Sequence, residues 1–247
     1  MRFDVSLLPG QSPRASAGVC VVIDVLRASS SIVTLLDRGA ATVVPAESIE
    51  AAVALHERLP DHLLCGERGG LPPAGFDYGN SPAEFSRLDL AGKGVILATS
   101  NGTRLLTTLA SAPAVLVGAL LNRSAAARAA LRLARNRRLD ITVCCSAAFS
   151  GSNFVLEDAL GAAAVVDAAY DAEPSIQLSD AARFARDAFR TAASDIGAAV
   201  ASAYHAQELT EAGLGADIAY CARLDISSVA PILERGEDGV ARIVPFA

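Results

Sequence analysis

Three segments of the chain repeat one pattern, in which an apolar run is followed by a polar turn and then by residues with helical apolar spacing. The apolar runs are residues 19–24, 94–98 and 141–145, and the turn after the third run extends to Asn153. Each segment is typical of a β-strand that leads through a turn into an α-helix. Repeated βα units predict an α/β fold with a mostly parallel sheet and helices on both sides.

The chain has 247 residues, which is long enough for one large α/β domain with a substantial core. No linker or low-complexity tract forces a domain boundary. The sequence therefore predicts a single domain over residues 1–247. Two interlocked α/β halves that meet near residues 120–140 are the alternative.

Charge and composition limit the partners that this chain can have. A net charge of −6 argues against binding to nucleic acid or to an anionic membrane surface. No apolar run approaches the roughly 20 residues of a membrane span, and the first ten residues lack the core of a signal peptide. Five cysteines without zinc or disulfide spacing favour a reducing compartment. We expect a cytoplasmic protein, and a homo-oligomer is compatible with the sequence.

The first turn carries an acid, an arginine and a run of serines. Asp24 ends an apolar strand, at the edge where α/β sheets bind ligands. Ser29 and Ser30 precede the helical spacing, so their hydroxyl and N–H groups can face an anion, and Arg27 can fork onto its oxygens. The structural alternative is equally compatible with the spacing: a serine N-cap and an Asp24–Arg27 ion pair.

The second turn follows the same logic. Asn101 and Gly102 favour a tight turn, Thr103 supplies a hydroxyl at a helix start, and Arg104 follows directly. An ordinary capped turn is the alternative. Two turns that suit anions at corresponding places in two βα units are more informative than either turn alone.

Between these turns, residues 65–82 form a stretch rich in Gly, Pro and Asn, which is typical of a long structured loop. It carries Glu67, Arg68 and Asn80 beside glycines that allow a backbone to approach a ligand closely. A surface loop without a ligand is the alternative.

The third helix begins near Glu157 and Asp158. Acids in a first helical turn commonly interact with the helix dipole. The same position also faces the carboxyl ends of the strands, where a hard cation would bind. Mg²⁺ prefers oxygen ligands and retains several waters, so one or two carboxylates suffice.

Several familiar phosphatase and nucleotide-binding motifs are absent from the sequence. Cys144 and Cys145 lack an arginine six residues further on, and no Gly-x-x-x-x-Gly-Lys-Ser/Thr motif occurs. Leu26 stands where an aspartyl-phosphate enzyme would carry its second aspartate. The three histidines at positions 56, 62 and 205 are isolated, and we expect surface or packing roles for them.

Taken together, the motifs resemble those of the 2-phosphosulfolactate phosphatase family, in order and in spacing over nearly the whole chain. They are VIDVLRASSS at 22–31, CGER at 65–68, GFDYGNSP at 75–82, TSNGT at 99–103 and ED at 157–158. The resemblance implies an α/β fold and a magnesium-dependent hydrolysis of 2-phosphosulfolactate to 3-sulfolactate and phosphate, on the route to coenzyme M.

With this resemblance, we assign a role to each candidate. Mg²⁺ would polarise the phosphoryl group and orient water. The expected metal ligands are Asp24, Glu67 and Asp158, and the catalytic set is Asp24, Arg27 and Glu67. The expected substrate-binding residues are Ser29, Ser30, Arg68, Asn80, Asn101, Gly102, Thr103 and Arg104, with Arg68 and Arg104 on the sulfonate or carboxylate.

Three alternatives remain at this point. Asp24 could act as a nucleophile and form an acyl-phosphate. The substrate could be another small phosphorylated acid. The protein could also be a non-catalytic binding protein for a phosphorylated metabolite.

Overall fold

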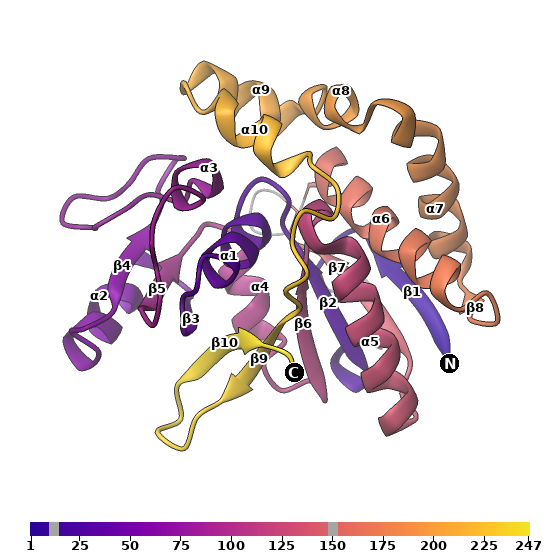
Figure 1. The fold of residues 1–247 in the computed structure, drawn as a ribbon, viewed down its shortest axis with the longest axis horizontal. Helices are drawn as coiled ribbons and strands as arrows, with labels where there is room; N and C mark the ends of the chain where they lie inside the picture. The colour runs from indigo at the N-terminus through magenta and orange to yellow at the C-terminus, as the bar shows by residue number, and fades with distance from the viewer. Residues whose placement is uncertain (10–14, 148–152) are drawn as a thin grey trace.

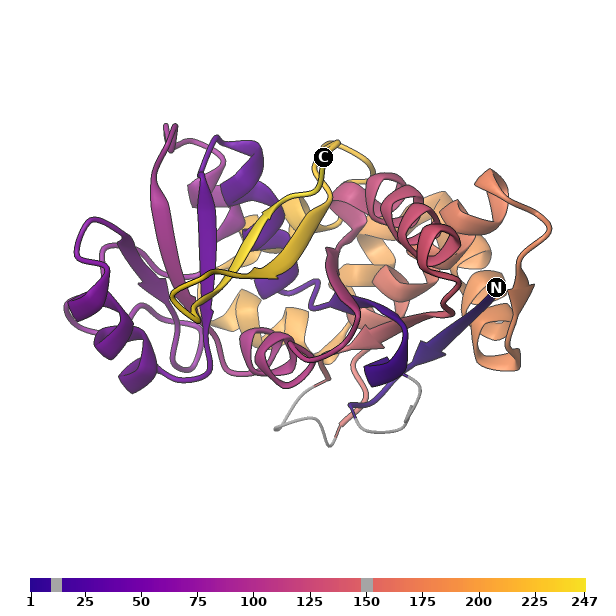
Figure 2. The same cartoon turned by 90° about the horizontal axis from the view of Figure 1, so that it is seen from below.

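The computed structural model describes residues 1–9, 15–147 and 153–247. Ten strands in this part of the chain form one mixed, mostly parallel sheet, with helices on both faces, so the predicted α/β fold is confirmed (Figures 1 and 2). Along the sheet the order is β4 (Leu63–Gly66), β5 (Gly94–Ala98), β3 (Thr42–Ala46), β10 (Ala241–Pro245), β9 (Pro231–Arg235), β6 (Ala114–Gly118), β2 (Val19–Ile23), β7 (Ile141–Cys145), β1 (Arg2–Ser6) and β8 (Gln177–Leu178).

The sheet consists of two parallel blocks joined by a C-terminal hairpin. The first block is β4, β5 and β3, and the second is β6, β2, β7, β1 and β8. Strands β9 and β10 pair antiparallel with each other and with the adjacent edges of the blocks. Strands β6 and β7, which flank residues 120–140, both belong to the second block. Whether the chain is one domain or two halves stays a prediction.

The three expected βα units are present, and each helix begins near the predicted turn. They are β2 with α1 (Ala28–Asp37), β5 with α4 (Gly102–Thr108) and β7 with α6 (Leu156–Ala172). Helix α1 begins earlier than its apolar spacing suggested, so Ser29 and Ser30 lie inside its first turn. Residues 148–152, part of the expected third turn, lie outside the described residues.

The remaining helices extend the same layers. They are α2 (Ile49–Arg58), α3 (Pro82–Phe85), α5 (Arg123–Arg137), α7 (Asp180–Ala192), α8 (Ile196–Ala201), α9 (Tyr204–Glu211) and α10 (Gly215–Cys221). Figure 1 shows α8, α9 and α10 following one another along one side of the molecule. In the part of the chain that the structure describes, none of the helices has both the length and the apolar character needed to cross a bilayer.

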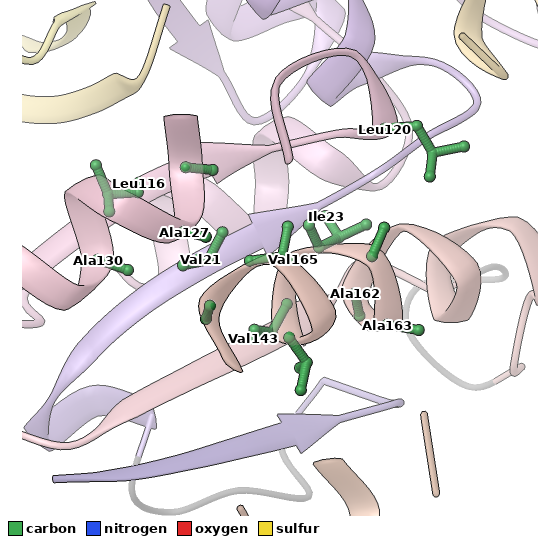
Figure 3. Close-up of a cluster of buried hydrophobic side chains, with 14 of the residues drawn as sticks. Val21, Ile23, Leu116, Leu120, Ala127, Ala130, Val143, Ala162, Ala163 and Val165 are labelled. Carbon is green, nitrogen blue, oxygen red and sulfur yellow. The ribbon is translucent and has the colours of Figure 1, made fainter. Parts of the chain in front are cut away.

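Alternation along β2 builds a core on each face of the sheet. Val19, Val21 and Ile23 face one cluster, and Cys20 and Val22 face another. The first cluster lies beneath α5 and α6, whose alanines let both helices approach the strands closely. Figure 3 labels ten members of that cluster: Val21, Ile23, Leu116, Leu120, Ala127, Ala130, Val143, Ala162, Ala163 and Val165.

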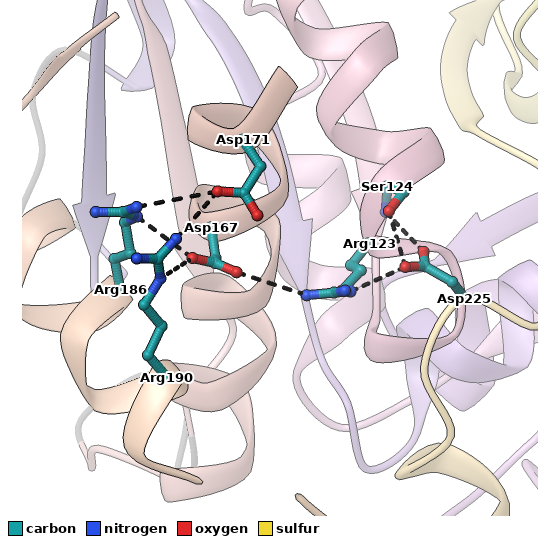
Figure 4. A network of polar contacts seen from close by, with 7 residues as sticks. All are labelled: Arg123, Ser124, Asp167, Asp171, Arg186, Arg190 and Asp225. Atoms are coloured by element: carbon teal, nitrogen blue, oxygen red, sulfur yellow. Dashed lines mark hydrogen bonds and ion pairs between the residues drawn. The ribbon is translucent and has the colours of Figure 1, made fainter. Parts of the chain in front are cut away.

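A network of charges joins the helices of the second block (Figure 4). Asp167 on α6 pairs with Arg190 and Arg186 of α7 at 2.7 and 3.3 Å and with Arg123 of α5 at 3.8 Å. Arg123 also pairs with Asp225, which precedes β9, at 2.9 Å. One buried carboxylate therefore ties α5, α6 and α7 together, and Arg123 extends the network to the C-terminal segment.

At Gly161, α6 packs closely against the end of β2 and the residues that follow it. A Cβ atom there would lie 2.5 Å from Val25 Cγ2 and 2.9 Å from Ile23 Cγ2. We expect Gly161→Ala to lower the free energy of unfolding by about 1–3 kcal/mol, because this clash outweighs the gain in helix propensity. Urea unfolding measures the change.

Gly197 of α8 provides the matched control. A Cβ there would have Asp195 Oδ1 as its nearest neighbour, at 3.7 Å, so Gly197→Ala should be neutral or stabilising by up to about 1 kcal/mol. If both variants gained stability equally, close packing of α6 on β2 would not constrain this position.

Candidate active site

A pocket of about 470 Å³ lies where the carboxyl ends of strands from both blocks meet, and we call it the main pocket. Asp24 follows β2, Glu67 follows β4, Thr99 follows β5 and Ser146 follows β7. A second pocket of about 330 Å³, called here the side pocket, shares Asp24 and Glu67 with it. The site is thus built from segments of both parallel blocks.

Asp24 is buried at the point where β2 turns into α1. Its Oδ1 accepts the N–H of Ala28 at 3.0 Å, and its own N–H donates to Ser29 Oγ at 2.8 Å. Burial raises the pKa of Asp24, while the hydrogen bond from Ala28 and the charge of His205 oppose the rise. The turn therefore fixes one carboxylate at the floor of the pocket.

Two more acids stand beside Asp24 at the start of α6. Asp158 accepts the N–H of Val25 at 2.8 Å through Oδ1, and the hydroxyl of Ser146 at 3.0 Å through Oδ2. Burial raises the pKa of Asp158 well above its usual range, and Asp24 and Glu157 raise it further. Burial, followed by the charges of Asp24 and Glu208, raises the pKa of Glu157.

The carboxylate of Glu157 has an oxygen that is available to bind a cation. Its side chain is buried, and Oε2 has no hydrogen-bond partner among the described residues. Across residues 1–9, 15–147 and 153–247, no three His, Cys, Asp or Glu side chains are grouped closely enough to supply a metal shell by themselves. One or two carboxylates with waters are the usual protein share of a Mg²⁺ site, so Asp24 and Glu157 fit that ion.

Glu67, a predicted metal ligand, connects two loops. Its Oε1 accepts both the N–H and the hydroxyl of Ser100, each at 2.8 Å, and its Oε2 accepts the N–H of Gly70 at 2.9 Å. The carboxylate lines both pockets while it holds the loop after β4 against the turn after β5. That loop is structured, as expected: Asp77 Oδ2, for example, accepts the N–H of Leu64.

Arg27 forms a buried ion pair that its sequence context did not suggest. Its Nη1 lies 2.7 Å from Oδ2 of Asp217 on α10, and its Nη2 donates to the carbonyl of Gly70 at 2.8 Å. Asp217 Oδ1 also accepts the hydroxyl of Ser81 at 2.6 Å and the N–H of Ala83. The Asp24–Arg27 pair considered as a structural alternative is thus replaced by an Arg27–Asp217 pair.

Three hydroxyls predicted to bind substrate are directed into the protein. Ser29 Oγ donates to the carbonyl of Val22, Ser30 Oγ to that of Val25, and Thr103 Oγ1 to that of Thr99. All three side chains are buried. These contacts favour a role in shaping the two turns, because each hydroxyl is committed to a backbone group.

Position 102 requires glycine because the start of α4 packs directly against the turn that follows β2. A Cβ there would lie 2.5 Å from Asp24 Oδ2 and 2.7 Å from the Cβ of Ala28, so only glycine allows α4 to start against the first turn. The two anion-suited turns of the sequence are therefore in contact in space.

The other predicted substrate-binding residues line the pockets. Asn101 lines both, Arg68 and Arg104 line the main pocket, and Asn80 lines the side pocket. Arg68 pairs with Glu50 at 2.8 Å at the exposed rim. The buried Oδ1 of Asn80 is unpartnered within the described part of the chain, which leaves an acceptor available for a ligand.

The sequence interpretation missed several residues of the site. His205, expected on the surface or in packing, lines both pockets together with Glu208, and both come from α9. Their i, i+3 spacing on a helix was the available signal. Ser146 and Asp217 gave none, because their roles depend on contacts between distant segments.

Fold and site together define an α/β protein whose acid-lined pocket has arginines at its edge, an arrangement suited to a small anionic substrate. A family model described as 2-phosphosulpholactate phosphatase matches residues 6–236. The chain therefore belongs to the 2-phosphosulfolactate phosphatase family, as its motifs indicated. It is an enzyme of the class that hydrolyses phosphate monoesters.

Curated relatives cover nearly the whole chain. A probable 2-phosphosulfolactate phosphatase of Deinococcus radiodurans is 38% identical over 247 residues, which are 100% of this chain and 99% of the relative. One of Carboxydothermus hydrogenoformans is 35% identical over 94% of this chain and 92% of its own length. One of Pseudothermotoga lettingae is 37% identical over 93% of this chain and 95% of its own length.

The buried acids predict how stability depends on pH. Because the folded-state pKa of Glu157 is raised, its contribution to stability is complete below its unfolded pKa and is lost as pH rises through the folded pKa. In the presence of a chelator, the melting temperature should fall as pH rises from about 4 toward 8. Glu157→Gln should make the melting temperature depend less on pH. Thermal unfolding followed by circular dichroism at several pH values measures this dependence.

Glu211→Gln, an exposed substitution on α9 with the same charge change, is the control for Glu157→Gln. It should follow the curve of the parent protein. If Glu157→Gln showed the same slope as the parent, ionisation of the buried Glu157 carboxyl would not be the cause of the fall.

The Arg27–Asp217 pair predicts a large stability effect. Both side chains are at most 3% exposed. Asp217→Asn should therefore cost about 3–5 kcal/mol of unfolding free energy, because the arginine charge stays buried without its partner. In a double-mutant cycle, Arg27→Gln combined with Asp217→Asn should cost clearly less than the sum of the single changes.

The exposed Arg68–Glu50 pair is the matched comparison for this cycle. Its side chains are 70% and 73% exposed, so Glu50→Gln should leave the free energy of unfolding almost unchanged. Strict additivity of the two changes at Arg27 and Asp217 would contradict a coupled ion pair.

Proposed function

We propose that this protein is a magnesium-dependent phosphatase that hydrolyses 2-phosphosulfolactate to 3-sulfolactate and phosphate. The names of its curated relatives support this substrate. The observation that carries the proposal is the group of buried acids Asp24, Glu157 and Asp158 at one pocket. Such a site repels a phosphate dianion unless a cation lies between them.

Asp24 and Glu157 are the residues that would hold Mg²⁺. Glu67 and Asp158, the other acids of the predicted set, already accept hydrogen bonds on both of their oxygens. They are better suited to fixing the loops around the ion than to replacing its waters. Mg²⁺, when bound, would neutralise phosphoryl charge and orient water for attack.

The residues around the acids suit the rest of the substrate. 2-Phosphosulfolactate carries a sulfonate and a carboxylate in addition to its phosphate. Arg68 and Arg104 line the main pocket, and a guanidinium is suited to planar or forked oxyanions. Asn101 adds an amide between the two pockets. These groups would hold the acidic ends of the substrate while its phosphate lies at the buried acids.

We also propose a cytoplasmic location and a role in coenzyme M biosynthesis. The location is supported by the five cysteines, which are all free and buried. The pathway depends on the proposed product, 3-sulfolactate.

The test is phosphate release from 2-phosphosulfolactate and from a panel of other phosphorylated small acids, with and without a chelator. We expect 2-phosphosulfolactate to be the preferred substrate, chelation to abolish turnover and Mg²⁺ to restore it. Asp24→Asn should lower turnover by at least about 10²–10³-fold, as does the loss of one major transition-state contact.

Full activity in excess chelator would contradict the proposed metal dependence. If another acid were hydrolysed far better, the substrate assignment would be wrong. If the Asp24→Asn variant melted early yet kept normal turnover when folded, Asp24 would be structural. A phosphoryl group trapped on Asp24 would make it a nucleophile instead of a metal ligand.

A further inference from the structure

Helix α9 brings a histidine and a glutamate to the pockets from the C-terminal part of the chain. His205 and Glu208 both line the main and the side pocket, together with Asp24 and Glu67. Nδ1 of His205 lies 3.0 Å from Oε2 of Glu208, one helical turn away. The imidazole is partly exposed, with 37% of its side chain accessible, so a substrate can reach it.

The contact with Glu208 orients the imidazole ring. An ionised carboxylate can only accept a hydrogen bond, so Nδ1 is the donor toward Glu208. Nε2, the second ring nitrogen, has no hydrogen-bond partner in the described part of the chain and can donate to a substrate. A carboxylate that fixes one ring nitrogen in this way is how acid–base histidines are held in a defined tautomer.

Acidic side chains predominate among the charged residues that line the pockets with His205. Asp24 after β2, Glu67 after β4, Glu157 on α6 and Glu208 on α9 are acidic, and Arg27 at the side pocket is already paired with Asp217. The interaction with His205 opposes the rise in the pKa of Asp24 and of Glu157, so the imidazole lies close enough to interact with both carboxylates.

We propose that His205 is the general acid that protonates the leaving oxygen of the substrate, and that Glu208 is its positioning residue. This inference rests on the proposed phosphatase function. Water adds to phosphorus, the bond between phosphorus and the C2 oxygen breaks, and its electron pair stays on that oxygen. The proton on Nε2 passes to the oxygen and gives the alcohol, while the proton lost by the water returns to the imidazole through solvent.

The leaving group explains why such an acid is needed. The C2 oxygen of sulfolactate leaves as a secondary alkoxide. An alkoxide is a strong base, and the neighbouring carboxylate adds negative charge to the leaving group. General acid catalysis of such a step is worth about 10²–10⁴-fold. Nitrophenolate is a weak base and leaves without a proton, so the hydrolysis of nitrophenyl phosphate does not require the acid.

The experiment compares His205→Gln with the parent enzyme on both substrates, in Mg²⁺. We expect kcat for 2-phosphosulfolactate to fall by about 10²–10³-fold, with a small change in KM, and kcat for nitrophenyl phosphate to stay within about threefold. Glu208→Gln should give a smaller loss with the same substrate selectivity. Imidazole added to His205→Ala should partly restore turnover of 2-phosphosulfolactate.

Glu211→Gln, on the same helix, is the matched control, and its activity on both substrates should equal that of the parent. Equal losses on the two substrates for His205→Gln, or a change confined to KM, would overturn the proposal. If the parent enzyme itself failed to hydrolyse 2-phosphosulfolactate, the proposed function would fail instead, and the two results are therefore distinguishable.

Discussion

The constraint on which the site depends is the burial of three acids at one place. Moving a carboxylate out of water costs several kcal/mol unless hydrogen bonds or a cation compensate. Asp158 is compensated by donors from Val25, Ser146 and Ala147, and it thereby pins the turn after β2 to the segment after β7. Glu157 is not compensated in this way at Oε2 within the described residues. The fold thus provides donors to both oxygens of Asp158 and leaves Oε2 of Glu157 for a ligand.

The sheet topology is what brings these acids together with the groups of the first block. Three antiparallel pairings, β3–β10, β10–β9 and β9–β6, separate the two blocks, so their strands have opposite polarity along the sheet. The carboxyl ends of β4 and β5 nevertheless reach the pocket that follows β2 and β7. Two contacts join the blocks here: Arg27 donates to the carbonyl of Gly70 in the loop after β4, and Gly102 packs directly against Asp24.

The sequence predicts the parts of this structure that depend on local pattern. The three βα units follow from apolar periodicity. Asp24 is identified because it ends an apolar run, and Glu67 because it lies beside glycines in the loop at residues 65–82 and within a family motif. The insertion of the hairpin between the blocks could not be predicted, because it joins β9 and β10 to strands more than a hundred residues earlier. The partner of Arg27 lies 190 residues away on α10. From the sequence, Ser29 and Ser30 could either bind an anion or stabilise the turn. Their burial, which the sequence does not show, favours the structural role.

Burial also separates the roles of two arginines, Arg27 and Arg68. Both terminal nitrogens of Arg27 are bound, one to Asp217 and the other to the carbonyl of Gly70. Replacing Arg27 would leave the buried carboxylate of Asp217 without a counter-charge. Arg68 is different, because both side chains of its pair with Glu50 are exposed, and solvent screens such pairs so that they contribute little to stability. A sulfonate or carboxylate can therefore replace Glu50 on Arg68 at little cost. Under the proposed function, recognition of the acidic ends of the substrate belongs to the rim arginines, and the buried arginine keeps the catalytic turn in place.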